Sequence, residues 1–405
     1  MAEITKALCD AVLKEDYGPD GIGNTAYEDN PWFAMMPKHK TKGKHFDFPV
    51  KYGYASNASH TASTALNKVN TVQYVEFNVT TVADYDAKSV ALQALAEATD
   101  EGAFVDVLRD TVDSLIKALS NRAGQHAFGH RGAALGQVAS ISTTTLVLTD
   151  IDDVSNFEVG MEIASSEANG LTGSLQAGSA TITAIDRATG TLTTDANWTD
   201  AGQIPSLDAD DFLFASGDFG IGRAGLADWC PITRTGLGTA FYGATRSVDE
   251  TRLAGQIVAG TGIPISHAIR KGAAVSGREA ARQDCALMSF ETYNDLVTEL
   301  DAKVQYVKGD SKGMDASIGF EGIKIAGPKG PIECYADRSC STNQLYLVKR
   351  DAWKAIHSQA TPIKIMDEDG GMLSREASSF GFDVRGSSLL NFACTKPNTN
   401  CVVTL

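Results

Sequence analysis

Residues 100–129, DEGAFVDVLRDTVDSLIKALSNRAGQHAFG, carry the strongest helical pattern in the chain. Apolar residues recur there every three or four positions, so they share one face of an α-helix. The recurring positions are Phe104, Leu108, Val112, Leu115 and Leu119. Asp100 and Glu101 open the stretch and suit the positive N-terminal end of a helix. At 1.5 Å per residue the helix would be about 40 Å long, far beyond the average of about 12 residues, which predicts a structural strut.

The region before this helix predicts a projecting hairpin. Apolar residues alternate with polar ones at Phe46, Phe48, Val50, Tyr52 and Tyr54, and again at Val75, Phe77 and Val79. A period of two is typical of β-strands. The residues between them, ASNASHTASTALNKVN (55–70), are small and polar and have no core-forming pattern. We therefore predict a long hairpin loop, with a flexible surface loop as the alternative. Earlier still, Asn30-Pro31 and Pro37 predict an extended arm, because proline fixes φ and moves its predecessor out of helix.

The composition and residue pattern of the chain change twice after the helix. Residues 137–213 are rich in Thr, Ser, Ala, Asp and Gly, contain no Lys, and show short alternating segments, which predict a small inserted β domain. Beyond it, residues 247–256 and 289–309 have helical patterns, and Ser289 is a candidate N-cap. Residues 322–337 and 343–350 have strand patterns. The whole chain is therefore predicted to be α+β.

Composition limits the classes of function. The chain has 405 residues, a net charge of −15 and a pI near 4.9, which argue against general nucleic-acid binding. Solubility alone would explain this charge, and a surface that lies near DNA without adhering to it is the alternative. The sequence has no membrane-span pattern and no apolar signal core. Its seven cysteines include no Cys-x-x-Cys pair, so we expect reduced thiols.

Catalytic and ligand-binding motifs are weak. Residues 220–225, GIGRAG, match G-x-G-x-x-G, but Pro231 stops any helix soon afterwards, so a glycine turn is favoured over a phosphate loop. His126 and His130 are four apart but have no acid between them in the HExxH manner. The acidic run at 366–371, MDEDGG, lacks the spacing of a calcium loop. We therefore predict no catalytic residue, no cofactor and no metal site.

Residues 333–348, ECYADRSCSTNQLYLV, resemble a nucleophile cluster at first sight. Cys334 and Cys340 are six apart, which fits neither a zinc site nor a redox motif. Alternation at Ile332 and Cys334 predicts a strand, and a turn at 337–339 would lead to a returning strand. The stretch is therefore interpreted as a strand–turn–strand unit in which Asp337 and Arg338 are candidates for salt bridges or turn hydrogen bonds.

Taken in order, several of these segments resemble the major capsid proteins of tailed double-stranded DNA bacteriophages, whose shared fold is called the HK-ninety-seven fold. The resemblance rests on their order, and the segments are LKEDYGPDGIGNTAYEDNPWFAMMPK (13–38), GKHFDFPVKYG (43–53), residues 100–129, VSNFEVGM (154–161), GDFGIGRAGLADWCP (217–231), SVDETRLAGQ (247–256) and residues 320–353. The inserted 137–213 region is the main departure, because many members lack it. The resemblance spans most of the chain.

The resemblance implies a domain organisation. It comprises an N-terminal arm at 1–43, an E-loop hairpin at 44–82, a peripheral (P) domain with a spine helix at 83–136, an inserted β domain at 137–213, P-domain strands at 214–245, an axial (A) domain at 246–365 and C-terminal strands at 366–405. The arm and the E-loop would lie across adjacent subunits. Candidate contact residues are Trp32, Phe33, Phe46, Phe48, Tyr52, Lys68, Tyr74, Phe77, Asp337 and Arg338.

The implied function is structural and not enzymatic. Subunits would self-assemble as hexamers and pentamers into an icosahedral capsid that encloses phage DNA without sequence-specific binding and without a membrane. A portal, a separate scaffolding protein and a cement protein are candidate partners. The protein would be made in the host bacterial cytoplasm and reside in the virion. The alternatives are an encapsulin-like nanocompartment shell, another virion part such as a decoration or tail-tube protein, and a nucleotide-dependent enzyme that uses GIGRAG.

Overall fold

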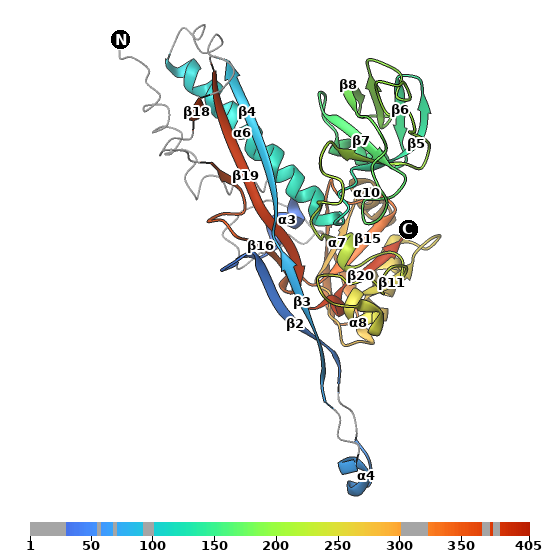
Figure 1. The fold of residues 1–405 in the computed structure, drawn as a ribbon. Helices are drawn as coiled ribbons and strands as arrows, with labels where there is room; N and C mark the ends of the chain where they lie inside the picture. Colours follow the sequence, from blue (N-terminus) through green and yellow to red (C-terminus); the bar gives the residue numbers. More distant parts are fainter. Residues whose placement is uncertain are drawn as a thin grey trace.

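The computed structural model describes residues 30–54, 58–67, 71–91, 101–300, 323–366, 373–375 and 381–405. It is an elongated α+β structure in which a long sheet and helix α6 run side by side (Figure 1). A β-barrel lies beside one half of this unit, a second sheet lies below the barrel, and a hairpin projects away from both. Within the described residues, no helix is long and apolar enough to cross a membrane.

The long sheet is organised around β19. Its strands are β1 (Lys38–Lys40), β16 (Trp353–His357), β19 (Gly381–Cys394), β17 (Lys364–Ile365), β4 (Val82–Ala91) and β18 (Leu373–Arg375). Strand β4, which the sequence analysis did not separate from the helical region, pairs antiparallel with β19 over ten positions. β19 thus joins the segment before α6 to the C-terminal part of the chain.

Helix α6 (Glu101–Phe128) starts one residue after the predicted Asp100 and packs along β4 and β19. Val112, Leu115 and Leu119 on its apolar face are buried. Gly386 of β19 makes the close approach possible, because a Cβ at that position would lie 2.4 Å from Cδ2 of Leu115. The predicted strut therefore depends on one glycine in a strand, 271 positions after Leu115 in the sequence.

Residues 136–215 form a closed six-stranded barrel in the order β10-β5-β6-β9-β8-β7. Its elements are β5 (Gly136–Ser142), β6 (Thr145–Leu148), the 3₁₀-helix η1 (Ile151–Asn156), β7 (Glu162–Ser166), β8 (Ala180–Asp186), β9 (Thr191–Thr194) and β10 (Phe212–Ala215). The barrel has its own core, with Phe157 and Trp198 fully buried. Its range extends one or two residues beyond the predicted 137–213.

The second sheet has the order β11-β20-β15-β12-β14-β13 and is accompanied by three helices. The elements are β11 (Gln256–Ala259), β12 (Cys285–Met288), β13 (Ile323–Gly327), β14 (Gly330–Ala336), β15 (Gln344–Val348), β20 (Cys401–Thr404), α8 (Glu250–Ala254), α9 (Ile265–Gly277) and α10 (Phe290–Leu300). Ser289 caps α10 as predicted, because its Oγ accepts a hydrogen bond from the amide of Thr292.

Residues 333–348 form a strand, a turn and a strand as predicted, but the second strand does not return beside the first. Strand β12 lies between β14 and β15, parallel to the first and antiparallel to the second. All four residues of β12, CALM, are buried, so this short apolar strand takes the central place and the turn after β14 crosses over it. The actual hairpin is β13–β14.

Two other predicted segments differ from the structure. The arm was predicted as extended, but Pro31–Met35 form the short helix α3, with Pro31 at a position where its missing N–H costs nothing. The predicted strands at 214–245 are wrong, because after β10 this range holds helix α7 (Leu226–Trp229), turns and a single bridge between Phe241 and Ala244. The acidic run at 367–371 lies outside the described residues.

The GIGRAG stretch packs against the end of α6. The amide of Gly222 donates to the carbonyl of Arg131 at 2.7 Å, that of Gly220 donates to the carbonyl of Gly132 at 3.0 Å, and that of Ala224 donates to Oδ1 of Asn391 at 2.9 Å. These amides are therefore satisfied within the chain. Gly225 is required for close packing, since a Cβ there would lie 2.2 Å from the carbonyl oxygen of His126.

We predict that Gly225→Ala lowers the free energy of unfolding by about 1–3 kcal/mol, the usual range for overpacking. The added methyl group would meet the main-chain oxygens of His126 and Ala127, which cannot move without displacing the end of α6. Urea unfolding of the full chain measures this. Gly238→Ala is the matched control, because a Cβ there has no neighbour within 4 Å. Equal stability of the two variants would contradict the packing role.

Candidate inter-subunit surface

The projecting hairpin consists of β2 (His45–Gly53), β3 (Gln73–Thr80) and the short helix α4 (Ala62–Asn67) near its tip (Figure 1). Its two ends differ in burial. Phe48 and Val50 of β2 are buried at the root, whereas α4 has no buried residue. Tyr54, Leu66 and Tyr74 are 67%, 75% and 58% exposed. The outer half of the hairpin therefore presents apolar side chains that its own chain does not cover.

Aromatic rings fix the hairpin root to the body. Phe48 stacks on Phe77 with ring centroids 5.7 Å apart, and Phe77 lies 5.2 Å from the ring of Trp229 on α7. Trp229 in turn meets Phe241 edge to face at 4.8 Å. Phe48 and Phe77 are thus core residues of a single chain. Their prediction as inter-subunit contacts is corrected, because they are at most 7% exposed.

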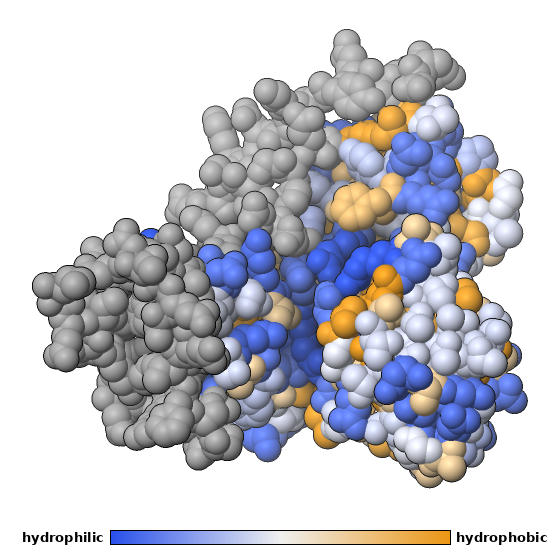
Figure 2. Space-filling model, turned by 90° about the horizontal axis from the view of Figure 1, so that it is seen from above, coloured by the Kyte–Doolittle hydropathy of each residue, from blue (hydrophilic) through white to orange (hydrophobic). Residues whose placement is uncertain are grey.

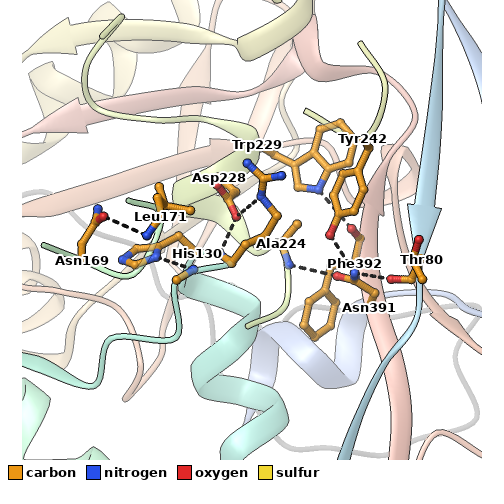
Figure 3. A network of polar contacts seen from close by, with 12 residues as sticks. Thr80, His130, Asn169, Leu171, Ala224, Asp228, Trp229, Tyr242, Asn391 and Phe392 are labelled. Atoms are coloured by element: carbon orange, nitrogen blue, oxygen red, sulfur yellow. Dashed lines mark hydrogen bonds and ion pairs between the residues drawn. The ribbon is translucent and has the colours of Figure 1, made fainter. Parts of the chain in front are cut away.

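A polar network continues this anchor (Figure 3). The side-chain amide of Asn391, on β19, donates to the carbonyl of Thr80 at the end of β3 and to the hydroxyl of Tyr242, at 2.6 and 2.8 Å. Its Oδ1 accepts the amide of Ala224. Burial raises the pKa of Tyr242 to about 12, so this hydroxyl stays protonated at neutral pH. Asn391 therefore joins the hairpin, β19 and the GIGRAG segment at one point.

The other end of the network holds the terminus of α6. Oδ2 of Asp228 accepts the amide of Arg131 at 2.6 Å and lies 3.4 Å from its Nε (Figure 3). The guanidinium of Arg131 lies 4.5 Å from the centroid of the Phe241 ring. The indole N–H of Trp229 donates to the carbonyl of Phe392. Helix α6, α7, β19 and the hairpin root consequently form one connected unit.

A buried group of charges stabilises the same unit nearby. Arg223 is fully buried, and its Nη2 lies 2.7 Å from Asp84 on β4 and donates to the carbonyl of Ser388 at 2.8 Å. Burial alone would raise the pKa of Asp84, but the charges of Arg223 and Arg122 outweigh it and lower that pKa. Burial lowers the pKa of His126 to about 3, so it is neutral near pH 7. His126 is thus a buried, neutral neighbour of these charges.

Sequence reasoning missed Asn391, Asp84 and Arg223. Asn391 had a local signal, since it is one polar residue inside the apolar run LLNFAC. Asp84 and Arg223 had none, because their significance comes from an ion pair between residues far apart in the sequence. Among the described residues, no group of three His, Cys, Asp or Glu is placed to hold a metal ion.

The remaining contact candidates divide by burial. Phe46 and Tyr52 are half-buried against the core, and the carbonyl of Tyr52 accepts a hydrogen bond from Arg252 at 2.6 Å. Tyr74 is exposed, as a contact residue requires. Lys68 lies outside the described residues. Of this group, Tyr74 remains available to a neighbour.

Trp32 and Phe33 were predicted to contact a neighbouring subunit, but they are core residues, since both are fully buried. The ring of Trp32 lies 5.6 Å from that of Trp353, edge to face, and Phe33 meets Phe392 at 6.2 Å. The physical reason is helix α3, which turns the predicted arm back onto the sheet and packs this pair against β16 and β19.

Asp337 is also corrected to an internal role. Its Oδ2 accepts the amide of Trp32 at 3.0 Å and its Oδ1 accepts the amide of Ser339 at 3.1 Å. Its side chain is 1% exposed, and burial raises its pKa to about 6 despite the opposing hydrogen bonds and Arg338. Arg338 donates to the carbonyl of Ser155 in the barrel at 3.3 Å, again within the chain. The Asp-Arg turn therefore joins α3, the second sheet and the barrel.

The surface drawn in Figure 2 offers no large apolar face. Hydrophobic residues appear there as small patches separated by hydrophilic ones. Such scattered patches are normal for a protein surface. The candidate contact surface consists of the exposed Tyr54, Leu66 and Tyr74 of the hairpin.

We predict that Asp337 makes stability fall as pH rises from about 4 to about 6. The folded state holds the Asp337 proton up to a pKa of about 6, whereas the unfolded state loses it near 3.8, so ionisation costs the folded state roughly 3 kcal/mol. Asp337→Asn removes this dependence. Denaturant unfolding at successive pH values measures the free energy of unfolding of wild type and variant. The difference between the two free energies should shrink or change sign across this window.

Asp351→Asn, at an exposed acid, is the control and should keep the wild-type pH dependence. If the difference in free energy of unfolding between wild type and Asp337→Asn stays constant from pH 4 to 7, Asp337 does not titrate as a buried acid.

No family model and no curated protein matches the chain. Among solved structures, a chain of the cyanophage A-1(L) capsid asymmetric unit is similar, with 13% identity and a TM-score of 0.55, over 93% of this chain and 92% of that one.

Two weaker similarities have TM-scores below 0.5, and no inference rests on them. One is to the SrpI encapsulin complex of Synechococcus elongatus PCC 7942, with 9% identity, a TM-score of 0.46 and coverage of 92% and 87%. The other is to a chain of Mycobacterium phage Adephagia, with 10% identity, a TM-score of 0.45 and coverage of 100% and 98%. From the first similarity, which extends over nearly the whole of both chains, the protein has the mixed α+β fold of a phage capsid chain.

Proposed function

We propose that this chain is the major capsid protein of a tailed double-stranded DNA bacteriophage, the subunit of its icosahedral shell. The observation that carries the proposal is the likeness to the cyanophage capsid chain over 93% of this sequence. The role is structural, and we assign no catalysis to it. The subunit would form hexamers and pentamers and reside in the virion, with a portal, a scaffolding protein and a cement protein as proposed partners.

The hairpin supports assembly on energetic grounds. An isolated two-stranded hairpin is at best marginally stable in water, and ordering each residue costs about 1–2 kcal/mol. Burial of Phe48 and Phe77 offsets this cost at the root, but α4 has no buried residue, and Tyr54, Leu66 and Tyr74 are more than half exposed in their own chain. A neighbouring subunit that covers Tyr54, Leu66 and Tyr74 would supply the missing burial. This assigns the hairpin the role of the E-loop.

The other elements acquire domain roles under the same proposal. The long sheet with α6 would be the P domain, with α6 as its spine helix. The second sheet, with α8, α9 and α10, would be the A domain. The barrel would be the inserted domain, and its separate core supports treating it as an added unit.

We predict that the purified chain forms closed icosahedral particles under assembly conditions, visible by negative-stain electron microscopy. The double variant Leu66→Asp, Tyr74→Asp should yield no closed particles, because charges would replace the apolar side chains that a neighbour must bury. Its circular dichroism and melting temperature should match wild type, since both residues are exposed in the single chain.

Val248→Ser is the control variant, because Val248 is 61% exposed but lies outside the hairpin, and it should still form particles. Rods, open rings or small monodisperse oligomers from the wild-type chain would contradict the shell function. Normal particles from the double variant would contradict the hairpin's part in it.

A further inference from the structure

A short basic segment interrupts this acidic chain. Residues 38–45 read KHKTKGKH, with four lysines, two histidines and no acid, in a protein whose net charge is −15. The segment runs from β1, at the edge of the long sheet, through a bend to the start of β2. The pairing of β1 with β16 and the hydrogen bond from Thr81 to the carbonyl of Lys44 fix both of its ends.

The four lysines are not equivalent. The ammonium of Lys38 points inward and donates to the carbonyl of Ala34 at 2.9 Å, at the C-terminal end of α3. Lys40, Lys42 and Lys44 are exposed. Within the part of the chain that the structure describes, none of these three ammonium groups pairs with a carboxylate. Lys38 thus anchors the segment, and the other three hold uncompensated charge on its surface.

The segment borders a hollow suited to an anion. Lys40, Thr41, Lys42, Gly43 and Ser358 line an open hollow of about 530 Å³. Gly43 leaves space, because a Cβ there would have no neighbour within 4 Å. Outside this lining, Lys354 on β16 adds a cation near the end of the basic segment, since its Nζ lies 5.4 Å from the centroid of the ring of Phe46, the residue that follows the segment. The next acid along the chain, Asp47, already lies on β2.

The charge of the barrel is opposite. Between residues 137 and 213 there are twelve acids, one arginine and no lysine, a net charge of −11. Figure 1 places the barrel and β16, the strand that pairs with the basic segment, on opposite sides of β19 and α6. A polyanion would therefore be attracted to one side of the subunit and repelled from the other.

We propose that Lys40, Lys42 and Lys44 bind the phosphate backbone of duplex DNA without sequence preference, so that this side of the subunit faces the genome. Only the orientation rests on the proposed capsid function. Lysine contacts to phosphate carry no sequence information, which suits a container for any sequence. The hollow lined by Lys40 and Lys42 has room for a phosphate group, and binding of these lysines to an acidic patch of a second subunit is the outcome that would contradict the proposal.

The test is binding of the unassembled full chain to a fluorescent 30-base-pair duplex, by anisotropy at several salt concentrations. Lys40→Gln, Lys42→Gln, Lys44→Gln should weaken binding at least tenfold at low salt. It should also reduce the slope of log affinity against log salt by about 2–3, since each neutralised phosphate contributes about 0.9. The control Lys271→Gln, Lys324→Gln, Lys329→Gln removes the same charge from the second-sheet region and should bind like wild type.

Electron microscopy of the same variants separates this inference from the shell function. Particles formed by the Lys40/42/44 variant, together with its loss of DNA affinity, would support the proposal. Equal DNA affinity for the two triple variants, or no binding by wild type at low salt, would overturn it. Loss of particles with unchanged DNA affinity would also overturn it, because the lysines would then serve a neighbouring subunit.

Discussion

The anchoring of the hairpin in the core of its own chain is the constraint on which the rest of the account depends. A hairpin that reaches another subunit must be fixed at one end and uncovered at the other. Phe48 and Phe77 supply the fixed end through Trp229 and Phe241. Asn391 adds hydrogen bonds to the last carbonyl of β3 and to Tyr242 (Figure 3). The aromatic contacts fix the position of the hairpin root, and the hydrogen bonds of Asn391 fix the direction in which the hairpin leaves the body.

Close backbone approach extends this anchor to the whole long unit. Gly386 lets α6 lie directly on β19, and Gly225 lets the GIGRAG segment lie against the last turn of α6. The GIGRAG stretch matches a nucleotide motif in sequence, but its role here is to pack against the end of α6. Its amides donate hydrogen bonds to main-chain carbonyls and to Asn391. Displacement of the hairpin root would disturb the same residues that hold α6, so the position of the hairpin is coupled to the frame of the chain.

Local periodicity was sufficient to predict α6, the alternating hairpin strands and the β-rich range around 137–213. It could not predict the place of β12, because a four-residue apolar strand is inserted between β14 and β15 by pairing across the fold. It also misassigned Trp32 and Asp337. Exposed arms and buried anchors have similar aromatic and polar composition, and the inward fold of this arm is shown by tertiary contacts such as the hydrogen bond from the Trp32 amide to Asp337. Asn391 alone of the missed site residues had a sequence signal.

Hydrogen–deuterium exchange of hairpin amides in particles and in unassembled chains tests the central claim most directly. Residues 58–67 and 73–80 are the informative segments, since their outer parts are exposed in the single chain. Coverage by a neighbouring subunit predicts slower exchange there in particles, with little change in the barrel core around Trp198. Equal exchange of the hairpin in both states would contradict the account, because the projecting hairpin would then remain uncovered after assembly.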